Sequence, residues 1–98
     1  EDALTSAARE LEEETGYRAA KFEIVGEFFS SPGMVSESFT LVRASGLTKV
    51  SEGGGVDGEN IVVHRVAMAD LQSFVQAKRA EGCVIDVKLL MLPGLAGL

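Results

Sequence analysis

The sequence is poor in the residues that build disulfides, metal–histidine sites and membrane spans. Its 98 residues include one cysteine, one histidine and no tryptophan. A single cysteine, Cys83, cannot form an intramolecular disulfide, and no secretory hydrophobic segment or membrane-length apolar run is present. We therefore expect a cytoplasmic protein with no membrane partner. Because Cys83 has no CxxC partner, we expect it to be a small buried apolar residue.

Basic residues are also few. The chain has nine lysines and arginines and fifteen acidic residues, which gives a formal net charge of −6. Residues 1–14 alone hold six acids and one base, so most of the net charge lies in one segment. Such a segment repels nucleic-acid backbones and bare phosphates unless a cation intervenes. We expect no nucleic-acid partner, whereas contact with a phosphate ligand through a metal ion is compatible with this charge.

The length and the hydrophobic content of 46% predict one small domain. Apolar and turn residues along the chain predict helices and strands in the order helix, two strands, loop, strand and two helices, which indicates a mixed α/β (α+β) domain. The expected helices are 1–15, a segment from Ala69 or Asp70 to Gly82, and 86–92 ending at Pro93; the expected strands are 22–29, 38–44 and 61–66; and the Gly-rich segment 51–60 is expected to be a mobile loop.

The first predicted helix has an acidic face. On a helix, Glu13 and Glu14 lie three and four residues beyond Glu10, so the three carboxylates share one side. Carboxylate oxygens are the ligands that Mg²⁺ prefers. Arg9 is placed to pair with Glu13 four residues on, and Gly16 to end the helix in a left-handed conformation. The alternative is an ordinary solvated helix face, which is the usual meaning of a Glu-rich run.

The run Arg9-Glu10-Leu11-Glu12-Glu13-Glu14-Thr15-Gly16-Tyr17, with Glu1 eight residues before Arg9, closely resembles the signature of the Nudix hydrolases. These enzymes cleave nucleoside diphosphates linked to another group. The resemblance implies that Glu10, Glu13 and Glu14 are ligands of Mg²⁺ or Mn²⁺. It further implies that Glu1 is a supporting acid and that Arg9 is an orienting base, whereas Glu12 occupies a variable, solvent-facing position.

A second segment, Ser31-Pro32-Gly33-Met34-Val35-Ser36-Glu37, resembles an element of the ADP-ribose pyrophosphatase branch of that family. The resemblance implies that Gly33, Met34 and Glu37 contact substrate. The alternative is a hairpin turn with one exposed acid.

A third segment, Asp57-Gly58-Glu59-Asn60-Ile61, resembles the acidic Glu-x-Glu-x-Ile segment of the same branch. It implies a carboxylate that activates or positions the attacking water. Either Asp57 or Glu59 could be this base, and the longer side chain favours Glu59. The alternative is that acids in a Gly-rich loop only aid solubility. For His64, the only histidine, a structural or surface role is favoured over catalysis.

The resemblance implies a Nudix fold, in which helices flank a mixed β-sheet. It also implies that residues 1–98 are the C-terminal portion of a single Nudix domain, because the motif's opening glycine and the strands preceding the helix would come before residue 1. An isolated fragment of this kind can therefore be inactive. Sheet edges left open would favour a homodimer.

The function that the three segments imply is hydrolysis of a nucleoside diphosphate sugar, above all ADP-ribose to AMP and ribose 5-phosphate. The alternatives are another nucleotide sugar, or a domain that senses a nucleotide without cleaving it.

Overall fold

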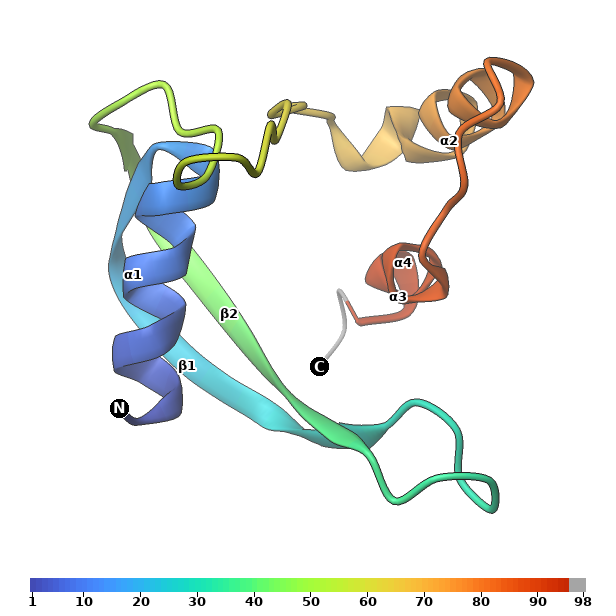
Figure 1. Ribbon diagram of the computed structural model, residues 1–98, viewed down its shortest axis with the longest axis horizontal. Coiled ribbons are helices and arrows are strands. Elements are labelled where there is room, and N and C mark those ends of the chain that lie inside the picture. Colours follow the sequence, from blue (N-terminus) through green and yellow to red (C-terminus); the bar gives the residue numbers. More distant parts are fainter. Residues whose placement is uncertain (96–98) are drawn as a thin grey trace. The chain divides into compact units, whose positions relative to one another are not determined.

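The computed structural model describes residues 1–95 and divides the chain into two compact units, Glu1–Val63 and His64–Leu98. The helices and strands follow in the order α1 (Ala3–Thr15), β1 (Tyr17–Phe29), β2 (Ser38–Lys49), the 3-10 helix η1 (Met68–Asp70), α2 (Leu71–Ala80), α3 (Val87–Leu90) and α4 (Leu92–Leu95) (Figure 1). Helices and strands together confirm the α+β class. Within the described range, none of the helices has the length and apolar character needed to cross a membrane.

Helix α1 has a defined cap at each end. At its start, Asp2 Oδ1 accepts a hydrogen bond of 2.7 Å from the Thr5 amide, and this bond lowers the pKa of Asp2 below its usual value. At its end, Gly16 takes the left-handed conformation with φ of 78°, and its N–H donates to the Glu12 carbonyl at 2.9 Å. The predicted helix and its terminating glycine are therefore confirmed.

The two strands form an antiparallel hairpin around the predicted Pro-Gly turn. The ladder runs from Tyr17 opposite Lys49 to Phe29 opposite Ser38, so both strands are longer than predicted. The extra residues include alanine, glycine and charged types with low strand propensity, and pairing with the opposite strand overrides that preference. The sheet described for residues 1–95 is antiparallel and two-stranded. The mixed sheet expected for the whole fold stays a prediction.

Helix α1 lies along the hairpin and contacts mainly β1 (Figure 1). Its apolar positions Ala7, Ala8 and Leu11 are half-buried, and Leu4 is exposed. Large apolar side chains on both strands also remain exposed, such as Ile24 and Leu47. The first unit therefore depends on its backbone hydrogen bonds more than on a deep core.

The loop after β2 passes over the C-terminal end of α1 (Figure 1). The amides of Gly54 and Gly55 donate to the carbonyls of Glu14 and Glu13, each at 2.8 Å. The last carbonyls of a helix have no partner inside it, so the loop supplies the missing donors. The predicted loop is thus tied to α1 by its backbone, and its mobility stays a prediction.

The strand predicted for residues 61–66 is absent, which is a correction. The β-branched residues there favour extended backbone, but a strand needs a neighbouring backbone to pair with. In the described part of the chain β1 and β2 pair only with each other, and the boundary between the two units falls after Val63.

The second unit contains the predicted helix, α2, whose Leu71 and Val75 are the buried hydrophobic residues of the described chain. Gly82 follows α2 with φ of 94°, as expected for a residue that closes a helix. His64 is exposed and contacts the ring of Phe74 at 5.1 Å between centroids, which agrees with the structural or surface role predicted for it.

Two further predictions for this unit are wrong. The helix predicted for 86–92 is divided into two: α3 ends at Leu90, and a separate helix, α4, begins at Leu92. Pro93 does not end a helix but is the second residue of α4, where the missing proline N–H costs no internal hydrogen bond. Cys83 is exposed and not buried, because it lies in the turn after α2, outside the apolar face of that helix.

The end of α1 gives a first prediction. A β carbon at Gly16 would overlap the carbonyl of Ser51, and a left-handed φ costs other residues about 1–3 kcal/mol. We expect Gly16→Ala to lower the free energy of unfolding of the whole protein by about 3 kcal/mol or more, since strain and overlap add. Urea denaturation measures this change.

The matched control is Gly58→Ala. Gly58 has φ of 88°, but a β carbon there would have no neighbouring atom within 4 Å, so only the backbone strain applies. Equal losses in the two variants would contradict the close approach of Ser51 to Gly16.

Candidate active site

Arg9 is the centre of an ion-pair network on α1. Its guanidinium lies 2.6 Å from a carboxylate oxygen of Glu1, 3.1 Å from Glu13 and 3.8 Å from Glu10. Hydrogen bonds to Glu1, and then to Glu13, raise the pKa of Arg9 above its already high value. The predicted pairing of Arg9 with Glu13 is confirmed, and Glu1 lies beside it.

The network has a positional effect more than a stabilising one. The side chains of Arg9, Glu1 and Glu13 are each more than a third exposed, so solvent screens their attraction. Two carboxylates from different ends of the helical segment are nevertheless held on one cation. Arg9 thereby fixes the direction of Glu13 on the acidic face.

The predicted metal ligands Glu10, Glu13 and Glu14 all lie on α1, at the spacing that puts them on one side of a helix. Their oxygens are hard donors that suit Mg²⁺ or Mn²⁺ in chemistry. Across residues 1–95, however, no three acidic, histidine or cysteine side chains are gathered at metal-binding geometry. The carboxylates are therefore suitable ligands for the metal. Their side chains do not form a closed coordination sphere, because Glu13 is turned to Arg9.

Glu12 has a partner that the local sequence did not indicate. Its two carboxylate oxygens accept hydrogen bonds of 3.1 Å from the Arg18 guanidinium. These bonds lower the pKa of Glu12 and raise that of Arg18. The pair spans Gly16, so only the turn between α1 and β1 brings the two residues together. Glu12 therefore ties the helix to the strand and is half-buried.

The loop that carries the two candidate bases lies at the C-terminal end of α1. Glu59 Oε1 accepts a hydrogen bond of 2.7 Å from the Val56 amide, and the Glu59 amide donates to the Val56 carbonyl at 3.1 Å. Asp57 is exposed at the tip of the same turn. The structure thus gives Glu59 a defined place in the loop, next to glycines bonded to the carbonyls of Glu13 and Glu14.

The predicted substrate-contacting turn lies at the other end of the hairpin. Gly33 has φ of 87°, Met34 is 87% exposed and Glu37 is exposed. The ladder between this turn and the end of α1 is 13 residues long on β1, about 40 Å at the usual rise of a strand. The structure does not bring Gly33, Met34 and Glu37 together with Glu59.

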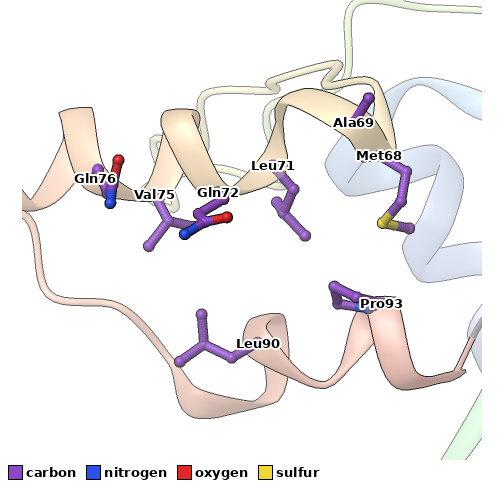
Figure 2. Close-up of a pocket in the computed structure, with 8 residues that line it drawn as sticks. All are labelled: Met68, Ala69, Leu71, Gln72, Val75, Gln76, Leu90 and Pro93. Atoms are coloured by element: carbon purple, nitrogen blue, oxygen red, sulfur yellow. The ribbon is translucent and has the colours of Figure 1, made fainter.

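The second unit has an apolar groove of about 400 Å³. Figure 2 shows Leu71 and Val75 of α2 facing Leu90 and Pro93 across it. Among the described residues that line it, the polar ones are two glutamines of α2, and none has a titratable side chain. These residues offer no groups for acid–base chemistry or metal binding.

Comparison with known proteins places the chain beside an activator protein and two kinds of pyrophosphatase. It is 35% identical to the methanol dehydrogenase activator of Bacillus methanolicus, over 94% of the chain and 51% of that protein. It is 35% identical to the GDP-mannose pyrophosphatase of Cronobacter sakazakii, over 86% and 43%, and to the ADP-ribose pyrophosphatase of Bacillus subtilis, over 74% and 40%. No family model matches the chain. The chain spans about half the length of the curated relatives it matches.

The pair of Glu12 and Arg18 predicts a pH dependence. The pKa of Glu12 is lower in the folded protein than in the unfolded chain, where a glutamate has a pKa of about 4.3. The ion pair with Arg18 therefore stabilises the fold above that pH, and this stabilisation is lost as the pH falls through the folded pKa. Because the pair is exposed and solvent screens it, we expect Glu12→Gln to destabilise the protein only slightly at neutral pH and to have no such effect in strong acid. Urea unfolding at a series of pH values measures the difference.

The control for this experiment is Glu37→Gln, which removes an exposed carboxylate from the hairpin turn. A Glu12→Gln effect that is the same at every pH would show that the ion pair with Arg18 does not contribute.

Proposed function

Since the chain is a distant member of the Nudix hydrolase family, we propose that the whole protein is a divalent-metal-dependent pyrophosphatase acting on a nucleoside diphosphate sugar. One observation carries the proposal. The acidic face of α1 and the loop with Glu59 are far apart in sequence, yet they are joined by backbone hydrogen bonds at Glu13 and Glu14.

In this proposal Glu10, Glu13 and Glu14 hold Mg²⁺ or Mn²⁺, which supplies charge neutralisation at the diphosphate and lowers the pKa of bound water. Arg9 keeps Glu13 directed along the acidic face. Such a positioned arginine reduces repulsion among the neighbouring carboxylates before substrate arrives.

Glu59 is the proposed general base, with Asp57 as the alternative from the same turn. The carboxylate takes a proton from water while the water oxygen forms a bond to phosphorus. The bond between that phosphorus and the bridging oxygen breaks, and the second phosphate leaves. Glu59 suits this role because its carboxylate accepts a hydrogen bond from the Val56 amide, which holds it in the loop beside α1.

ADP-ribose, cleaved to AMP and ribose 5-phosphate, is the favoured substrate. The turn with Gly33, Met34 and Glu37 resembles the ADP-ribose pyrophosphatase branch, and one relative is named for that activity. Two relatives are named GDP-mannose pyrophosphatase, so GDP-mannose is the second candidate. Both strands of the hairpin have one unpaired edge in the described chain, which is compatible with a homodimer.

The direct test is incubation of the whole protein and of the 98-residue chain with ADP-ribose and Mg²⁺, with GDP-mannose in parallel, followed by chromatography for AMP or GMP. We expect AMP from the whole protein. GMP alone would move the assignment to GDP-mannose, and nucleotide binding without any product would favour a sensing domain.

The metal ligands give a further prediction. Glu13→Gln and Glu14→Gln should each lower turnover of the whole protein by about 100-fold or more, because a neutral amide is a poor ligand for a hard cation. The same variants should weaken binding of Mn²⁺, measured by electron paramagnetic resonance.

Glu12→Gln is the matched control on the same helix, since Glu12 bonds Arg18 instead of facing the metal side. It should retain turnover and Mn²⁺ binding. Unchanged turnover in both Glu13→Gln and Glu14→Gln would contradict the ligand assignment.

A further inference from the structure

The loop beside α1 contains three consecutive glycines, each with a left-handed φ. These values are 70° for Gly53, 100° for Gly54 and 86° for Gly55. Their backbone path lets two successive amides reach the carbonyls of Glu14 and Glu13. Those carbonyls belong to the last turn of α1, where helical partners are missing. The glycines therefore connect the loop to the residues that carry two of the proposed metal ligands.

Gly53 allows this approach because it lacks a side chain. A β carbon at Gly53 would lie 2.7 Å from the Glu14 carbonyl oxygen and 2.5 Å from the carbonyl carbon of Thr15. Both atoms are backbone and cannot move without displacing the helix end. Gly53 is thus required for the contact itself.

Gly55 has a different neighbour, the side chain of Glu59. A β carbon at Gly55 would lie 2.7 Å from Cβ and 2.8 Å from Oε1 of Glu59. The same Oε1 accepts the hydrogen bond from the Val56 amide. The space occupied by the Glu59 carboxylate therefore exists only because residue 55 has no side chain.

We propose that Gly55 is a positioning residue, which holds the carboxylate of Glu59 in register with the end of α1 that carries Glu13 and Glu14. The proposal deepens the pyrophosphatase function and rests on it. Gly55 acts twice, because its amide fixes the loop to the Glu13 carbonyl and its bare α carbon leaves room for Glu59. A general base contributes only when it lies within hydrogen-bond reach of the water it activates, so a displaced carboxylate loses its effect.

The chain offers a matched control at Gly58. Its φ of 88° is nearly that of Gly55, so alanine carries a similar backbone strain at either position. Nothing lies within 4 Å of a β carbon at Gly58, whereas at Gly55 the Glu59 side chain must move. Any difference between Gly55→Ala and Gly58→Ala therefore reports on Glu59 and not on the cost of a left-handed alanine.

The first arm of the test measures turnover in the whole protein. Gly55→Ala should lower kcat by about 100-fold or more, in the range expected for loss of a general base, with a smaller change in KM. Gly58→Ala should lose much less. Glu59→Gln, which keeps the shape of the side chain, should lose about as much as Gly55→Ala.

A double variant then separates positioning from structural damage. If Gly55 acts through Glu59, the combined Gly55→Ala and Glu59→Gln variant should be no slower than Glu59→Gln alone. If the fold-losses in kcat of the two single variants multiply in the double variant, the proposal is overturned, because the two residues would then act independently.

The second arm does not use activity. Hydrogen exchange of the Val56 amide reports whether Glu59 occupies its place, since the Glu59 carboxylate is the acceptor for that amide. Exchange should become faster in Gly55→Ala and in Glu59→Ala and stay near the wild-type rate in Gly58→Ala. An unchanged Val56 amide in Gly55→Ala would overturn the proposal.

The two arms also separate this proposal from the function on which it rests. Absence of nucleotide product from the wild-type protein would overturn the pyrophosphatase function and, with it, the catalytic role of Glu59. Product from the wild-type protein together with equal kcat in Gly55→Ala and Gly58→Ala would leave that function standing and overturn the role of Gly55.

Discussion

The capture of the C-terminal end of α1 by the Gly-rich loop is the interaction on which the first unit depends. Gly16 turns the chain out of the helix, and its carbonyl accepts hydrogen bonds from the amides of Val50 and Ser51 at 2.8 and 3.1 Å. The amides of Gly54 and Gly55 then donate hydrogen bonds to carbonyls of the last helical turn that have no partner within the helix. Because apolar side chains are only half-buried in this unit, these backbone contacts fix the loop where hydrophobic packing alone would not.

The hydrogen bonds between the loop and α1 matter for the chemistry, because the residues that they join include acidic ones. Glu13 and Glu14 accept the loop amides with their backbone carbonyls, so these contacts do not involve their carboxylates. Arg9 draws Glu1 and Glu13 together, while Arg18 draws Glu12 to the strand. The two arginines thus divide these carboxylates between a network on the helix and a helix–strand link.

Much of the first unit could be predicted from local patterns. The spacing of apolar residues predicted α1, Gly16 predicted its end, and the Pro-Gly turn predicted the hairpin, because each depends on residues close in sequence. The predicted strand at 61–66 was wrong, since extended propensity does not supply a pairing partner. Pro93 and Cys83 were misplaced for a related reason: the position of a proline within a helix and the burial of a cysteine depend on where the neighbouring helices begin and end.

The same distinction between local and long-range features applies to the candidate site. The sequence by itself determined which chemical groups are present: the carboxylates at helical spacing, the arginine four residues from Glu13, and the acids of the Gly-rich loop. Only the tertiary structure decided which of them are neighbours. It joined the Glu59 loop to the end of α1, and it placed the turn with Met34 at the far end of the hairpin. Helical spacing is a local property of the backbone, whereas contacts between residues distant in sequence depend on hydrogen bonds and steric fit that form only when the chain is folded.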